Sequence, residues 1–178
     1  PHGAQRTIYE ERAQQYVERV DDGTVTFVDK DRFLVRQESF SGYMHLYLYS
    51  IRRGRLAQVT GGEWEVTQVV GPDGKRDWYL STETSPLRRN LYSVRLDGCD
   101  KRRLPEGEGY YTEVPRRGMK YFVTTFSNTR TPNRVEVCDA AGNTIRTLCD
   151  NRDLRIRLMV ANRPAKEFFT FRTERGDD

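Results

Sequence analysis

The chain has 178 residues, of which 36% are hydrophobic and 31% are charged, and its 30 basic and 26 acidic residues give a formal net charge of +4. A chain of this length normally forms one domain with a buried core. The near balance of charges predicts a mixed surface and argues against a nucleic-acid-binding protein. No apolar run reaches the roughly 18 residues of a membrane span, and residues 1–15 lack the apolar centre of a signal peptide.

A short helical turn at residues 10–16 is the first expected element, and the chain then repeats one pattern three times. Each repeat opens with a strand that ends in polar residues, and these strands start at Arg32, Asp77 and Lys120. A β-hairpin follows each strand, and the hairpins turn at Gly54, Gly98 and Gly142. Successive turns are therefore 44 residues apart.

A period near 44 residues with several short β segments is typical of β-propeller blades, because one four-stranded blade cannot cover its own faces. The hairpins support strands rather than helices, since Leu46 and Leu48 alternate with Tyr47 and Tyr49. We therefore expect an all-β protein, a partial β-propeller of about three four-stranded antiparallel blades. A β-sandwich whose hairpins recur by coincidence is the alternative.

The expected domain organisation treats residues 1–178 as one fragment of a propeller domain. The blades are placed at roughly 17–62, 63–108 and 109–151, followed by an exit segment at 152–178. Residues 151–158 fit either a helical turn or a strand, because Leu154, Ile156 and Leu158 alternate with charged residues.

Motifs of catalysis and metal binding are missing from the sequence. There is no GxSxG turn, phosphate-binding loop, CxxC pair or Cys/His cluster. Of the two histidines, His2 lies near the chain start and His45 occupies the position of Asn90 in the next repeat, which favours a structural role. Cys138 and Cys149 lie on two arms of one hairpin, but the turn position predicts that they do not face each other. We expect no catalytic residue, metal or cofactor in this chain.

Four motifs together carry a family resemblance: GEWEV at 62–66, SPLRRNLY at 85–92, LCDN at 148–151 and PAKEFFTFRT at 164–173. From about Thr7 to Thr173 the chain resembles the late propeller blades of dipeptidyl peptidase IV enzymes of the prolyl oligopeptidase family, most closely the bacterial type. The resemblance implies a propeller that precedes an α/β-hydrolase domain carrying a Ser, Asp and His triad. The parent enzyme would remove X-Pro or X-Ala dipeptides from peptide amino termini, and this fragment alone would be inactive.

The same resemblance suggests where substrate would touch this segment. Residues 17–22 match a family loop beside the pocket for the second substrate residue, where an arginine and an aromatic residue contribute. Arg19 preserves the residue type, whereas Val20 and Asp21 depart from the family pattern. The paired-glutamate helix of the family would lie upstream, so Glu10 and Glu11 are not its equivalent.

The partners implied by the resemblance are a peptide substrate, the remaining blades and the hydrolase domain, in a periplasmic, cell-surface or extracellular setting in a bacterium. An isolated fragment would expose two sheet faces, so we expect self-association through residues 33–39 and 167–173, or cover by rearranged terminal segments. Two other functions stay open. One is a non-enzymatic propeller scaffold, and the other is a carbohydrate- or peptide-binding β-domain of a cell-surface system that uses exposed Tyr110 and Tyr111.

Overall fold

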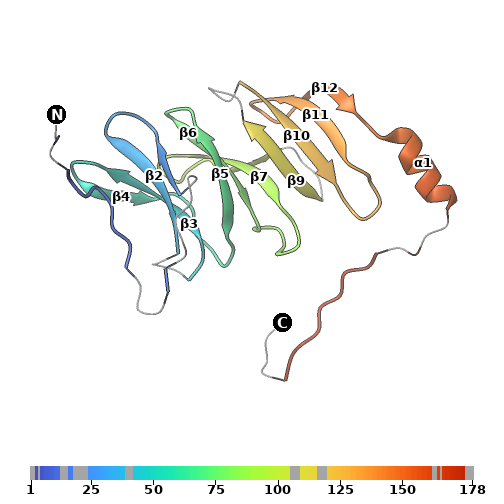
Figure 1. Cartoon of the computed structure of the whole chain (residues 1–178), viewed down its shortest axis with the longest axis horizontal. Helices are drawn as coiled ribbons and strands as arrows, with labels where there is room; N and C mark the ends of the chain where they lie inside the picture. The colour runs from blue at the N-terminus through green and yellow to red at the C-terminus, as the bar shows by residue number, and fades with distance from the viewer. Residues whose placement is uncertain are drawn as a thin grey trace.

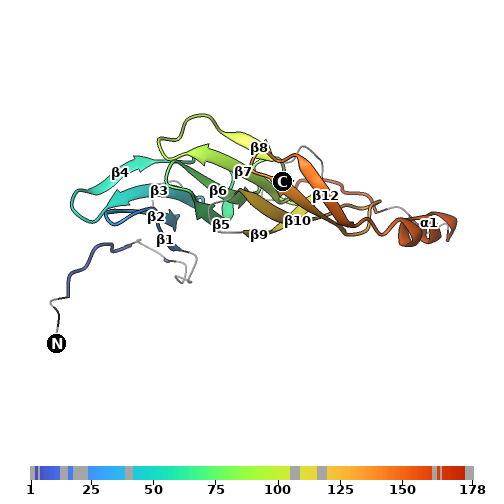
Figure 2. The same cartoon turned by 90° about the horizontal axis from the view of Figure 1, so that it is seen from above.

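The computed structural model describes residues 3, 5–12, 16–17, 24–38, 42–104, 109–115, 120–161, 164 and 166–174, with only the backbone described for 113–115. Within these residues the strands form three separate four-stranded sheets, each with its strands antiparallel and in chain order. Figure 1 shows the sheets side by side, and Figure 2 shows them following one another along the long axis. The architecture is that of a partial β-propeller, and the β-sandwich alternative is wrong.

The blades are defined by their strands. The first blade comprises β1 (Val25–Phe27), β2 (Arg32–Gln37), β3 (His45–Ser50) and β4 (Gly54–Gln58). The second comprises β5 (Val66–Pro72), β6 (Arg76–Ser81), β7 (Asn90–Arg95) and β8 (Arg102–Leu104). The third comprises β9 (Tyr110–Pro115), β10 (Tyr121–Ser127), β11 (Arg134–Asp139) and β12 (Thr144–Cys149). The helix α1 (Arg152–Val160) follows, and the segment after it runs back below the third blade in Figure 1.

The three predicted turn glycines all lie at strand-connecting turns. Gly54, Gly98 and Gly142 have φ values of 73°, 81° and 88°, a left-handed conformation that side chains other than glycine rarely adopt. The 44-residue spacing therefore reflects the need for a glycine with positive φ at one turn of each blade.

Because successive side chains of a strand point to opposite faces, the second blade packs against the first blade with one face and against the third blade with the other. Leu34 of β2 packs against one face of the second blade. On that face Tyr79 and Tyr92 stack, with their ring centroids 5.7 Å apart. On the other face of the second blade, Trp78 and Leu91 join the core that it shares with the third blade. We call these two contacts the first seam and the second seam.

One backbone hydrogen bond crosses each seam at equivalent positions. Val66 N–H donates to Met44 O over 2.7 Å in the first seam, and Tyr111 N–H donates to Arg89 O over 2.8 Å in the second. The next equivalent carbonyl is that of Asn133, and it accepts a 2.5 Å hydrogen bond from Asn151 Nδ2, beside the start of α1. The repeat of the blades is thus also a repeat of backbone links.

The segment around residue 151 is helical, so the strand alternative is wrong. Asn151 adopts a left-handed conformation with φ 48°, its carbonyl accepts the first helical hydrogen bond from Arg155, and α1 continues to Val160. The helical turn expected at 10–16 falls partly outside the described residues, and residues 10–12 and 16 are not helical. No helix among the described residues has the length and apolarity needed to cross a membrane.

The cysteine prediction is confirmed. Cys138 pairs in register with Thr144, whereas Cys149 pairs with Val135, so the two thiols do not face each other. None of the three cysteines, all of which are among the described residues, forms a disulfide bond.

Candidate functional site

Antiparallel order gives each blade two different ends. The turns within β1–β2, β3–β4 and their equivalents gather at one end, which we call the hairpin end. The connections between the second and third strands, and those between blades, gather at the other, which we call the loop end. The described surface is hollowed at both ends.

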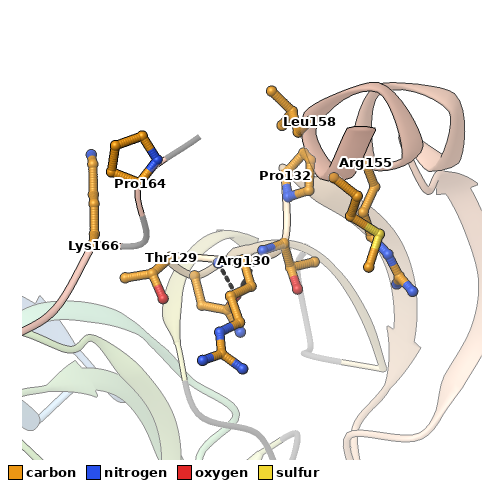
Figure 3. Close-up of a pocket in the computed structure, with 10 residues that line it drawn as sticks. Thr129, Arg130, Pro132, Arg155, Leu158, Pro164 and Lys166 are labelled. Atoms are coloured by element: carbon orange, nitrogen blue, oxygen red, sulfur yellow. Dashed lines mark hydrogen bonds between the residues drawn. The ribbon is translucent and has the colours of Figure 1, made fainter. Parts of the chain in front are cut away.

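One hollow at the loop end lies between the β10–β11 connection, α1 and the returning C-terminal segment (Figure 3). Two adjoining cavities of about 440 and 470 Å³ share Asn128, Thr129, Arg130 and Lys166 as lining residues. We call the pair the loop-end groove. The second cavity extends it to Arg88 and Tyr110, beside the second seam.

Local hydrogen bonds fix the wall of the loop-end groove. Asn128 Oδ1 accepts from the backbone N–H groups of Arg130 at 3.0 Å and Thr131 at 2.8 Å, an arrangement in which an asparagine side chain stabilises a turn. The Asn151 bond to Asn133 O ties the same connection to the start of α1. The wall therefore consists of a braced turn and the residues of α1 from Arg155 to Met159 that face it.

The charge of the loop-end groove is of one sign. Its charged lining residues are Arg88, Arg130, Arg155 and Lys166, and no described carboxylate lines it. In Figure 3 Arg130, Arg155 and Lys166 surround the hollow without pointing toward one another. The cations are thus spread along the groove instead of converging on one point.

The hollow at the hairpin end, of about 530 Å³, has a different charge pattern. Arg76 lies 2.6 Å from Asp100, and Arg95 lies 2.7 Å from Asp97. Arg32 lies 2.7 Å from Asp29, whose pKa is lowered to about 2 by backbone hydrogen bonds from Asp31 and Arg32 and by the Arg32 side chain. Three of the four cations that line this hollow are therefore paired with a carboxylate, whereas Arg130, Arg155 and Lys166 of the loop-end groove form no ion pair with a described residue.

The two seams also differ in their buried carboxylates. Asp77 is fully buried in the second blade, and its oxygens form no well-aligned hydrogen bond with any described residue. Burial raises its pKa well above the ordinary value, the Asp73 charge raises it further, and the Trp78 backbone N–H offsets this only in part. Glu136 in the third blade is buried too, but it lies 3.1 Å from Arg134 Nε.

His45 is fully buried and both of its ring nitrogens have partners. Nε2 lies 2.9 Å from Gly62 O and Nδ1 lies 3.2 Å from Thr60 Oγ1. His45 and Asn90 both begin the third strand of their blades, as the sequence predicted, and both are buried. His45 therefore anchors the connection between the first and second blades.

The remaining predicted positions have mixed outcomes. Arg19, Val20 and Asp21 lie outside the described residues, as does His2, so their roles stay predictions. Tyr110 is half exposed and lines the loop-end groove, but the expectation of an exposed Tyr111 is wrong. Tyr111 is buried because adjacent strand residues point to opposite faces, and its ring packs 4.9 Å from Phe126.

Metal ligands do not gather in the described part of the chain, where no group of three His, Cys, Asp or Glu side chains lies close enough to hold an ion. The loop-end groove cannot be identified from the sequence. Its cations come from residues 88, 130, 155 and 166, which no motif connects, so only the path of the chain reveals them.

Comparison with known proteins gives a consistent result. Residues 2–133 match the family model described as the dipeptidyl peptidase IV (DPP IV) N-terminal region. Probable dipeptidyl peptidase 4 of Aspergillus flavus is 28% identical over 133 residues, which covers 72% of this chain and 17% of the relative. The corresponding protein of Emericella nidulans is 29% identical over 149 residues, covering 82% and 19%.

The crystal structure of Porphyromonas gingivalis dipeptidyl peptidase 4 has the same fold, with a TM-score of 0.83 and 30% sequence identity. The match covers 92% of this chain and 23% of that chain. The chain thus spans about a fifth of the length of the relatives it matches.

Proposed function

Because the chain belongs to the dipeptidyl peptidase IV N-terminal region family, we propose that it is the non-catalytic β-propeller portion of a serine-type dipeptidyl peptidase. The full-length protein would remove X-Pro or X-Ala dipeptides from peptide amino termini. The observation that carries this proposal is the extended match of fold and sequence to a small part of a much longer dipeptidyl peptidase 4.

The chemistry of the described residues supports a division of labour. Acyl transfer by a serine enzyme needs a nucleophile, a base and an orienting acid within hydrogen-bond reach. His45 is buried, and its ring nitrogens are engaged by Gly62 and Thr60. The triad would therefore be supplied by another part of the protein, and this chain would supply walls.

The role of the walls would be to shape access and substrate binding. The loop end carries open cavities lined by the connections between strands, whereas the seams are filled by aromatic and aliphatic side chains. Peptide would thus reach the loop end more readily than the seams. The hydrolase domain and the remaining blades would be the intramolecular partners, and the full-length protein would act in the periplasm or at the cell surface of a bacterium.

The test is an amidase assay on the full-length protein and on the 178-residue chain in parallel. We expect the full-length protein to release p-nitroaniline from Gly-Pro-p-nitroanilide, and not from its N-acetylated form, because a dipeptidyl peptidase needs the free amino terminus. The 178-residue chain alone should release nothing above buffer.

Two results would contradict the proposal. One is a folded full-length protein that leaves both Gly-Pro and Gly-Ala amides intact. The other is turnover by the 178-residue chain that survives repurification and is lost in His45→Ala.

A further inference from the structure

The loop-end groove holds positive charge that the fold itself does not use. Arg130, Arg155 and Lys166 line it, and none of them forms an ion pair with another described residue. At the hairpin end, by contrast, Arg76 and Arg95 each lie within 2.7 Å of a carboxylate oxygen. Cations without intramolecular partners attract an anionic ligand, most strongly where a hollow partly excludes water.

The geometry selects among anions. A single phosphate or carboxylate would need donors that converge on one point, whereas the three side chains lie around the hollow and point apart (Figure 3). Charges distributed in this way fit a ligand whose own charges are spaced along a chain.

The uncharged lining is partly polar, with Asn128 and Thr129, and partly apolar. Leu158 and Met159 of α1 and Pro132 of the β10–β11 connection form one wall, and Phe168 lines the adjoining cavity. Met159 is 70% exposed and Phe168 is 65% exposed, so both rest on the surface ready for contact. A ligand with alternating acidic and apolar side chains would match both features.

We propose that the loop-end groove binds an acidic stretch of an extended peptide through Arg130, Arg155 and Lys166. The inference rests on the proposed function in one respect, since a peptidase meets peptides. A peptide fits better than a nucleic acid, because the cations of the groove are few and spaced apart and the net charge of the chain is only +4, whereas a nucleic-acid site follows a continuous phosphate backbone. A groove for single-stranded nucleic acid would also need aromatic rings in series along a cationic track.

The experiment measures fluorescence anisotropy of a labelled, N-acetylated peptide that alternates glutamate with phenylalanine and glycine. The 178-residue chain should bind it, bind it more weakly as salt rises, and bind the glutamine version of the peptide more weakly still. The triple variant Arg130→Gln, Arg155→Gln, Lys166→Gln should lose about tenfold in affinity, which corresponds to about 1.4 kcal/mol, because each of the three exposed ion pairs contributes only a fraction of that amount.

A matched control removes the same charge from the other end of the blades. Lys30→Gln, Arg53→Gln, Lys75→Gln changes three exposed turn residues at the hairpin end and should change affinity less than about twofold, as expected for distant charges screened by salt. Circular dichroism of both variants should match the parent chain, since all six side chains lie at the surface.

Three outcomes would overturn the proposal: equal losses in the two triple variants, no preference for glutamate over glutamine, or tighter binding of labelled single-stranded DNA than of the peptide. The acetylated peptide has no free amino terminus, so the result does not depend on peptidase activity. If the full-length protein is active but the propeller does not bind the peptide, the groove proposal is wrong and the proposed function stands.

Discussion

The three blades leave two outward faces, one on the first blade and one on the third, and these faces differ in how far they are buried. On the outward face of the first blade, Phe33 and Tyr49 stack at 5.6 Å and are buried beneath Ile8 and Tyr9 of the N-terminal segment. On the third blade the outermost strand, β12, is exposed at every residue, and Tyr121 of β10 is 55% exposed. One end face is covered by its own chain and the other is open.

The difference teaches that a blade fold does not by itself bury both of its faces. The same alternating pattern places apolar side chains on either side of every sheet, so each blade needs a neighbour or a substitute. A short stretch of residues 5–12 is a sufficient substitute for the first blade. The third blade has no such cover among the described residues, and α1 has none of its residues buried.

The largest expected effect tests whether the two faces really differ in burial. Phe33→Ala removes a fully buried ring and should lower the free energy of unfolding by about 3–5 kcal/mol. Tyr121→Ala on the open face should change it by less than about 0.5 kcal/mol. Urea denaturation of both variants measures this, and similar losses would mean that the third blade is covered in solution.

A second test compares the buried carboxyl groups of the second and third blades, Asp77 and Glu136. Glu136→Gln breaks a pair with Arg134 and should destabilise the chain by about 1–3 kcal/mol near neutral pH. Asp77→Asn should have the opposite sign, because it replaces a buried carboxyl that has no well-aligned partner.

The pH dependence of stability gives a further test of the buried Asp77 carboxyl group. The raised pKa of Asp77 means that the folded state holds a proton that the unfolded state has lost, from about pH 4 up to the folded pKa. Stability should therefore fall as pH rises through that window. In Asp77→Asn the fall should be smaller by about 1.4 kcal/mol per unit of pKa shift. Unfolding curves that respond to pH identically in the parent chain and the variant would contradict the assignment.

A smaller effect concerns the N-terminal cover itself. The Tyr9 hydroxyl lies 3.0 Å from Glu11 Oε2 and 3.1 Å from Gln37 Oε1, and Gln37 Oε1 also accepts from Tyr49. Tyr9→Phe should cost about 1 kcal/mol, since the ring stays and one hydrogen bond is lost. Tyr16→Phe, in a residue that is 71% exposed, is the control and should be neutral. Equal melting temperatures for the two variants would show that the cover does not depend on this bond.

The smallest expected change in stability accompanies a change in association. Ile145→Thr and Leu148→Ser replace exposed apolar residues of β12 and should alter stability by less than about 0.5 kcal/mol. We expect the parent chain to self-associate through its open end, so the double variant should shift light scattering toward the monomer. A parent chain that stays monomeric at high concentration would contradict this.

The sequence predicted the blades well because their determinants are local. Turn glycines need a positive φ, and alternation of side chains follows directly from strand geometry. Alternation also explains why Tyr110 is exposed and Tyr111 is buried, because the two residues occupy opposite faces of β9.

The loop-end groove and the end covers depend on where terminal segments return. For Phe33 and Val35 the sequence left two outcomes open, a contact between copies or cover by terminal segments, and Ile8 and Tyr9 of the N-terminal segment pack against them within one chain. Phe168 and Phe169 do remain exposed. Periodicity contains no information on such tertiary paths, so Arg130 and Lys166 could not be brought together from sequence alone.

The hydrogen bond from Asn151 Nδ2 to Asn133 O bears on how copies of this fold could add to one another. The carbonyls of Met44 and Arg89 each bind a backbone N–H of the following blade, so an open carbonyl at Asn133 would offer a foreign strand the same place. Repetition of such a head-to-tail link from copy to copy gives a filament when the rotation does not close. The asparagine side chain occupies this position within the chain itself. At this position copies can then meet through side chains, and contacts of that kind dissociate more readily than a shared backbone ladder.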